Sequence, residues 1–152
     1  MLNEGDNVPK FAINDANGNK VKSTDFKGKK HVIYFYPKDF TPGCSTQADE
    51  FSTDYKKFQD KDIEIIGISP DDVDSHKKFC EKMGIKYVLL ADTEKEVSKA
   101  FGVWGMKKFM GREYMGVIRS TFLANEKGEI FKIYPKVKPK GHAKQVLEDF
   151  TK

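Results

Sequence analysis

Short apolar runs alternate with amphipathic segments along most of the chain. The runs have the length of strands, and the segments between them repeat apolar residues with helical spacing. In chain order, strand-like and helix-like stretches lie at 32–36, 44–59, 63–69, 74–83, 87–91 and 94–101. Thr93 and Glu96 form a capping-box pair at the start of the last helix-like stretch. Such alternation is typical of βαβ units and a parallel sheet.

Turn signals predict one hairpin before this alternating region and one after it. Near the N-terminus, 11–14 and 19–22 flank the turn sequence Ala16-Asn17-Gly18. Farther along, 121–124 and 129–134 flank a four-residue turn and predict an antiparallel pair. The predicted fold class is therefore α/β, a central mixed β-sheet flanked by helices, with an N-terminal hairpin.

The remaining segments are a final helix and one stretch without a clear pattern. Apolar residues at helical spacing predict a helix at 141–150. The stretch at 104–118 has three glycines and mixed polarity, so we expect a long irregular segment there.

Length and composition narrow the class of protein. A chain of 152 residues with 38% hydrophobic residues and no visible linker or repeat predicts one domain over 1–152. The apolar runs are far shorter than the roughly 20 residues that cross a bilayer, so no membrane span is expected. The first residues do not read as a secretory signal, which favours a cytoplasmic location.

Charge and histidine content exclude two further kinds of site. The net charge is only +4, and the lysines are interspersed with acidic residues, so nucleic-acid binding is not indicated. The three histidines have no metal-ligand spacing, and no metal site is expected. Only two cysteines occur, too few for the disulfide framework of a secreted domain, which points to redox or nucleophilic chemistry.

The residues around Cys44 combine features that activate a thiol. Cys44 follows a buried strand and opens a helix, where aligned peptide dipoles and unpaired N–H groups favour a thiolate. Pro42 suits a helix start, Gly43 permits close backbone approach, and Thr41 adds a hydroxyl. The alternative is that Cys44 is only a small apolar residue on the core-facing side of its helix.

At this point the sequence resembles a known family. Pro37, Thr41 and Cys44 match the P-x-x-x-T-x-x-C motif of peroxiredoxins, and the full run 35–44 is similar to the peroxiredoxin Q, or bacterioferritin comigratory protein, branch. The likeness continues through Gly5-Asp6 to Pro9 and through 101–104, 114–116 and 119–122, so it covers nearly the whole chain.

The resemblance implies a thioredoxin-like fold and the reduction of hydrogen peroxide and organic hydroperoxides by thiol chemistry, without a metal or organic cofactor. By matched position, Cys44 is the peroxidatic nucleophile and Thr41 hydrogen-bonds the peroxide. Pro37 shields the sulfur, and Arg119 completes the site, where a guanidinium stabilises both the thiolate and the leaving oxygen. Alternatively, Arg119 is a surface residue at the start of a strand; Arg112 matches no motif position.

The resemblance also bears on Cys80. Many family members carry a second cysteine five residues after the first, where this chain has Asp49. The resemblance then implies that Cys80 resolves the Cys44 sulfenic acid as an intramolecular disulfide, which thioredoxin or a similar dithiol recycles, in a monomer. Against this role, Cys80 lies beside Phe79 and shares a helix face with Met83, as an inert core thiol would.

Two other functions remain open. A thioredoxin-like disulfide oxidoreductase is disfavoured because the chain has no C-x-x-C motif. A redox-sensing chaperone or binding module would use Cys44 to sense peroxide and would respond through an interaction instead of turnover.

Overall fold

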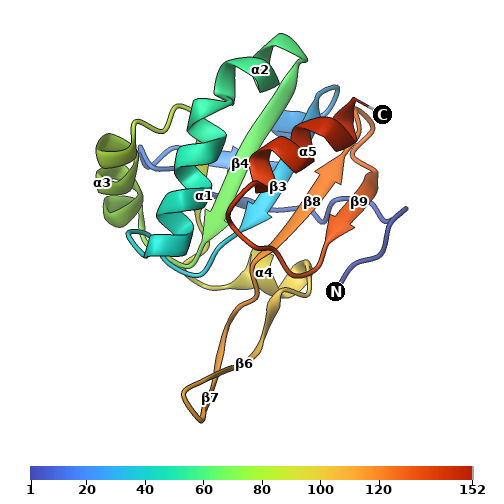
Figure 1. The fold of residues 1–152 in the computed structure, drawn as a ribbon. Helices are drawn as coiled ribbons and strands as arrows, with labels where there is room; N and C mark the ends of the chain where they lie inside the picture. The colour runs from blue at the N-terminus through green and yellow to red at the C-terminus, as the bar shows by residue number, and fades with distance from the viewer. Residues whose placement is uncertain (152) are drawn as a thin grey trace.

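A five-stranded mixed sheet forms the centre of the computed structural model, which describes residues 1–151 (Figure 1). The strand order is β5-β4-β3-β8-β9. The elements are β1 Ala12–Asn14, β2 Lys20–Lys22, a 3-10 turn Ser23–Phe26, β3 Lys30–Phe35, α1 Pro42–Thr53, α2 Tyr55–Asp60, β4 Ile63–Ser69, α3 Val73–Met83, β5 Val88–Ala91, α4 Glu96–Ala100, β6 Trp104–Phe109, β7 Arg112–Val117, β8 Ser120–Ala124, β9 Ile130–Tyr134 and α5 His142–Phe150.

The pairing of the strands confirms the predicted α/β class. β3, β4 and β5 run parallel to one another, as expected for βαβ units, and β8 pairs antiparallel with both β3 and β9. The expected N-terminal hairpin also forms, since β1 and β2 pair antiparallel. The helix expected at 44–59 is divided in two at Asp54, between α1 and α2.

Side chains of β3 alternate between two apolar layers, one on each face of the sheet. Tyr34 belongs to the layer shared with α1, α2, α3 and α5. Ile33 and Phe35 belong to the layer shared with α4 and the N-terminal segment. Because both faces are covered, the central strands are continuous apolar runs, which explains why their positions were easy to predict.

The segment at 104–118 is not irregular, so that prediction was wrong. β6 and β7 pair antiparallel as a two-stranded ribbon that projects from one end of the sheet (Figure 1). Met110 and Gly111 both have positive φ, 51° and 80°, as the central residues of a tight hairpin turn require. The apolar alternation that marks a half-buried strand is missing because most of the ribbon is exposed on both faces.

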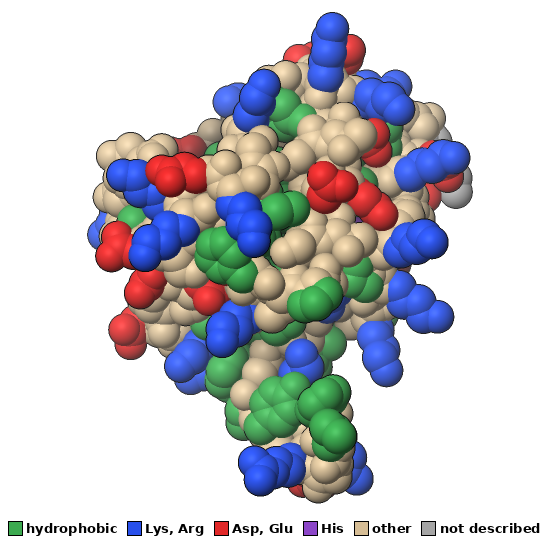
Figure 2. Space-filling model, turned by 60° about the vertical axis from the view of Figure 1, so that its left-hand side comes forward, with side chains coloured by type: hydrophobic (Ala, Val, Ile, Leu, Met, Phe, Trp, Pro, Cys, Tyr) green, Lys and Arg blue, Asp and Glu red, His purple; other side chains and the backbone are tan. Residues whose placement is uncertain are grey.

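Exposed apolar side chains gather on this ribbon (Figure 2). They are Met106, Phe109, Met110, Tyr114 and Met115. Within residues 1–151, no helix has the length and apolar character that crossing a membrane requires.

The capping box predicted at Thr93 and Glu96 does not form. The carboxylate of Asp92 accepts the backbone N–H groups of Val97 and Ser98 and the hydroxyl of Ser98. Asp92 directly follows β5 and is buried, so its side chain reaches the first turn of α4 from the end of the strand.

His142 makes the stability of this fold dependent on pH. It is buried at the start of α5, where Nε2 bonds the Thr121 hydroxyl at 2.8 Å. Burial, with a smaller contribution from the positive charge of Arg119, lowers the pKa of His142 to about 4, against a hydrogen bond with Gln145 that raises it. The unfolded chain therefore binds more protons than the folded one between about pH 6.5 and 4.

We expect the free energy of unfolding to fall by about 2 kcal/mol through this residue between pH 7.5 and pH 5. The contribution of His142 to the free energy of unfolding is fully present above about pH 6.5, and it is lost as the pH falls toward 4. Urea unfolding of the parent and of His142→Gln, which keeps a polar side chain but does not titrate, measures the difference. An equal loss in both proteins would contradict the assignment.

Candidate active site

Cys44 lies in the first turn of α1 and its side chain is buried. Thr41 is the N-cap residue, with extended backbone angles, and Pro42 occupies the first helical position, as a helix start favours. No side chain caps this turn, and the Thr41 hydroxyl donates to the Lys38 carbonyl at 2.9 Å. The Cys44 sulfur therefore lies at the positive end of the helix dipole, beside N–H groups that lack helical partners.

Arg119 contacts this sulfur from a distant part of the chain. It lies between β7 and β8, and its Nη2 is 3.3 Å from Cys44 Sγ. Its Nη1 donates to Gln47 Oε1 at 2.6 Å, so the guanidinium is fixed between two side chains of α1. A Cβ on Gly43 would lie only 3.0 Å from Nη2. Glycine at this position thus permits the close approach of the guanidinium.

A second cation lies near the same sulfur. The Nζ of Lys107, on β6, donates to the Val117 carbonyl at 3.0 Å. Partial burial and then the charge of Arg119 lower the pKa of Lys107, while the negative charge of the Cys44 thiolate raises it. The site is thus electropositive and suits an anionic sulfur.

Cys80 lies apart from this cluster, in the last turn of α3, and both cysteines are free thiols. It is half-buried and lines an open cleft of about 310 Å³ with Asp15, Lys77 and Lys86, among others. Burial, and then the negative charges of Asp39, Asp15 and Glu81, raise the pKa of Cys80 to about 11. The thiol is therefore protonated at neutral pH in this arrangement.

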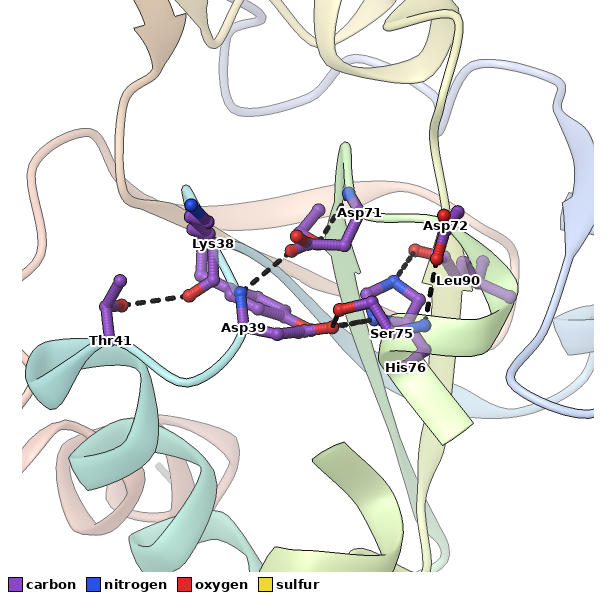
Figure 3. Close-up of polar contacts among 10 residues, drawn as sticks. Lys38, Asp39, Thr41, Asp71, Asp72, Ser75, His76 and Leu90 are labelled. Atoms are coloured by element: carbon purple, nitrogen blue, oxygen red, sulfur yellow. Dashed lines mark hydrogen bonds and ion pairs between the residues drawn. The ribbon is translucent and has the colours of Figure 1, made fainter. Parts of the chain in front are cut away.

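Three side chains could in principle hold a metal ion. The ligand atoms of Asp39, Asp71 and His76 lie within 4.8 Å of one another. They are already used: His76 Nδ1 bonds Asp39 Oδ2 at 2.7 Å, and Asp71 Oδ2 accepts the backbone N–H of Asp39 and the Ser69 hydroxyl (Figure 3). Hydrogen bonds account for this group, and a metal would have to break them.

Comparison with known proteins identifies the family. Residues 5–133 match the AhpC/TSA family. The chain is 44% identical to peroxiredoxin Bcp of Bacillus subtilis over 144 residues, which are 95% of this chain and 92% of that protein. The chain belongs to the AhpC/TSA family.

Solved structures give the same result. The chain resembles a cysteine-to-serine mutant of Xylella fastidiosa PrxQ with a TM-score of 0.94 and 32% identity, over 99% of this chain and 96% of that one. It also resembles the Xanthomonas campestris bacterioferritin comigratory protein, whose alkyl peroxide reduction activity has been studied, with a TM-score of 0.88 and 34% identity, over 93% and 90% of the two chains. This chain is thus a peroxiredoxin of the Bcp or peroxiredoxin Q type, with a thioredoxin-like fold, and a thiol-dependent peroxidase.

The peroxiredoxin structure brings together some of the residues that the sequence predicted. Arg119 and Cys44 are in contact although 75 residues separate them. Thr41 lies in the same turn as Cys44, and Pro37 is half-buried in the segment that joins β3 to α1. Cys80 is on another helix and is not bonded to Cys44.

Sequence reasoning missed Gln47 and Lys107. Gln47 follows Cys44 by three residues, which places it on the same side of α1, and this spacing was the available signal. Its side chain is fully buried, its Oε1 accepts from Arg119, and its Nε2 has no hydrogen-bond partner among residues 1–151. No sequence pattern pointed to Lys107 as a site residue, because an irregular segment was expected at 104–118 and such a segment gives no direction for its side chains.

We expect Arg119→Lys to slow peroxide reduction by about 10- to 100-fold. Lysine keeps the charge but cannot bond Cys44 and Gln47 at the same time through a planar group. Stopped-flow oxidation of Cys44 by hydrogen peroxide measures the effect. Arg112→Lys, at the exposed start of β7, is the matched control because these are the two arginines of the chain. Equal rates in both variants would contradict the role of Arg119.

Proposed function

We propose that this peroxiredoxin reduces hydrogen peroxide and organic hydroperoxides with Cys44 as its nucleophile, Cys80 as its resolving thiol and thioredoxin or a similar dithiol as its reductant. The observation that carries the proposal is the 3.3 Å contact between Arg119 Nη2 and Cys44 Sγ at the start of α1. It fixes a delocalised cation beside a sulfur that must be anionic to attack.

In the first step, the Cys44 thiolate attacks one oxygen of the hydroperoxide. A sulfur–oxygen bond forms and the O–O bond breaks, so the sulfur becomes a sulfenic acid and the electron pair leaves on the second oxygen. That oxygen takes a proton and departs as water or an alcohol. Arg119 stabilises the thiolate and then the charge that develops on the leaving oxygen.

We assign supporting roles to two residues of the preceding segment. Thr41 binds the hydroperoxide through its hydroxyl, which donates to the Lys38 carbonyl at 2.9 Å. Pro37 shields the sulfur from water. Neither role needs a metal or an organic cofactor.

In the second step, the Cys80 thiol attacks the sulfenic acid, a disulfide forms, and water leaves with the proton of Cys80. Exchange with an external dithiol then restores both thiols and oxidises that dithiol to its disulfide. Both cysteines belong to one chain, so a monomer is sufficient for this cycle.

We infer that α1 and α3 change locally when the disulfide forms. The two Cα atoms must come within about 7 Å, and both cysteines are held in helices that pack on the sheet. We propose that residues around 44–49 and around 79–83 unwind, while the strands stay unchanged. Gly84, with a φ of 66°, ends α3 just beyond Cys80 and provides a flexible boundary.

A redox-controlled binding module is a second candidate function. The exposed apolar side chains of the β6–β7 ribbon favour it. Steady-state peroxide consumption with thioredoxin distinguishes the two, because a peroxidase must turn over many times and a sensor need not.

We expect Cys44→Ser to abolish peroxide reduction and leave the fold intact, since a hydroxyl is a far weaker nucleophile at neutral pH. Peroxide consumption by the purified variant, alongside its circular dichroism, provides the test. Turnover comparable to the parent would refute the assignment of Cys44.

Cys80→Ser should permit one round of peroxide reduction and then stop. Cys44 should remain as sulfenic or overoxidised acid, and thioredoxin should not recycle it. Intact-mass spectrometry after one equivalent of peroxide shows the oxidation state, with the parent protein as the control for the Cys44–Cys80 disulfide. Undiminished thioredoxin-driven turnover would disprove the resolving role.

Hydrogen exchange tests the unwinding. Amides at 44–49 and 79–83 should exchange faster in the disulfide form than in the reduced form, and amides of β3 and β4 should not change. Equal protection of both helices in the two forms would exclude it.

A further inference from the structure

The carboxylate of Asp39 is buried and accepts hydrogen bonds from three side chains (Figure 3). Tyr36 donates to Oδ1 at 2.6 Å, and Ser75 donates to Oδ2 at 2.8 Å. His76 Nδ1 lies 2.7 Å from Oδ2. We call these four residues the Asp39 network. It joins the turn before α1 to the first turns of α3.

The hydrogen-bond pattern indicates that Asp39 and His76 form a buried ion pair. His76 Nε2 lies 2.9 Å from the Leu90 carbonyl, which only accepts, so Nε2 carries a proton. Tyr36 and Ser75 both donate to the Asp39 carboxylate, which favours its ionised form. A 2.7 Å contact between Nδ1 and the carboxylate Oδ2 needs a proton between the two atoms, so Nδ1 carries one as well. The two side chains are 1% and 0% exposed. Removing one member of such a pair leaves the other charge buried without a partner.

Further contacts hold the same turn against α3. The Asp39 N–H donates to Asp71 Oδ2 at 2.8 Å. Phe40 has a φ of 68°, unusual for a residue with a side chain, and its ring packs edge-on against Phe79 at 5.1 Å. The turn therefore keeps a strained conformation that its contacts with α3 stabilise.

The network lies just before each cysteine in the sequence. Asp39 precedes Cys44 by five residues, and His76 precedes Cys80 by four, about one helical turn. A change at Asp39 can therefore affect the segments that carry both thiols.

Asp39 also acts on Cys80 through its charge. After burial, it is the largest cause of the raised pKa of Cys80, ahead of Asp15 and Glu81. Lys77, Lys86 and Tyr87 line the same cleft. We call the arrangement with α1 and α3 both folded the closed arrangement. It keeps Cys80 as a thiol, which is a poorer nucleophile than a thiolate.

We propose that Asp39 is a positioning residue: it holds the arrangement that reduces peroxide and delays the unwinding that disulfide formation needs. Its bonds to Ser75 and His76 hold the turn before Cys44 in the arrangement that reduces peroxide. These bonds loosen when the two helices unwind for disulfide formation. The inference rests on the proposed function, in which Cys80 attacks the Cys44 sulfenic acid and water leaves.

Asp39→Asn in the full chain tests this role. In the proposed cycle, most molecules have the closed arrangement and a small fraction has the helices unwound. Weakening the closed arrangement therefore multiplies the unwound fraction but leaves the closed fraction almost the same. Disulfide formation should become about tenfold faster. This factor corresponds to the lower end of the free energy that a hydrogen bond to a charged group contributes. The rate of Cys44 oxidation should change by less than about twofold. Rapid quenching followed by intact-mass spectrometry measures both steps.

Two further readouts separate positioning from a merely structural role. The fraction of Cys44 that is overoxidised at high peroxide should fall by about tenfold, because faster resolution competes with the second oxidation. The pH dependence of disulfide formation should also shift to lower pH, because one negative charge near Cys80 is removed.

Asp72→Ala is the matched control. Asp72 caps the same helix by accepting the Ser75 N–H at 2.8 Å and belongs to neither the network nor the catalytic site. If this variant speeds disulfide formation as much as Asp39→Asn, general weakening of α3 explains the effect and the proposal is wrong. Ser75→Ala removes one bond to Asp39 but keeps its charge. It should give a smaller increase without the pH shift, and it decides the matter if Asp39→Asn does not fold.

Unchanged or slower disulfide formation in folded Asp39→Asn would overturn the role of Asp39. The proposed function fails in a different way: the parent protein would form no Cys44 sulfenic acid, or no disulfide between Cys44 and Cys80.

Discussion

The contact between Arg119 and Cys44 depends on how β3 and β8 pair. The two strands run antiparallel with Phe35 opposite Ser120, so the end of β3 lies beside the start of β8. α1 begins seven residues after Phe35, and Arg119 directly precedes Ser120. A shift of one residue in this register would turn every side chain of β8 to the other face of the sheet and remove the guanidinium from the sulfur. Burial of both faces fixes the register, and the register fixes the site.

The two thiols make opposite demands on the structure. As the proposed nucleophile, Cys44 needs a fixed helix start and a fixed cation beside its sulfur. In the proposed cycle, Cys80 must reach it, which the packed helices oppose. A protein that meets both demands must keep the first turn of α1 folded around Cys44 and must also let the same turn unwind at a low cost in free energy. Three features lie in the segments next to the two cysteines: the strained turn at Phe40, the end of α3 at Gly84 and the Asp39 network.

The histidines show how burial gives similar side chains different properties. His142 is buried against a neutral hydroxyl, and burial lowers its pKa. His31 bonds the Lys29 carbonyl, and its pKa is lowered mainly by burial as well. His76 contacts a carboxylate instead, with its Nδ1 2.7 Å from Asp39 Oδ2. The partner that the fold supplies therefore decides what each imidazole does.

The sequence by itself determined most of the fold and the position of the proposed nucleophile, because both follow from local patterns. The buried strands are continuous apolar runs, the amphipathic helices repeat at helical spacing, and Cys44 opens a helix after Pro42. The motif also pointed to Arg119, but only the tertiary structure put it 3.3 Å from the sulfur. The ribbon of β6 and β7 escaped prediction because it buries too little to show an alternating pattern. Gln47, Lys107 and the Asp39 network were decided by contacts between distant segments, and a sequence pattern cannot show which distant side chain will satisfy a buried charge.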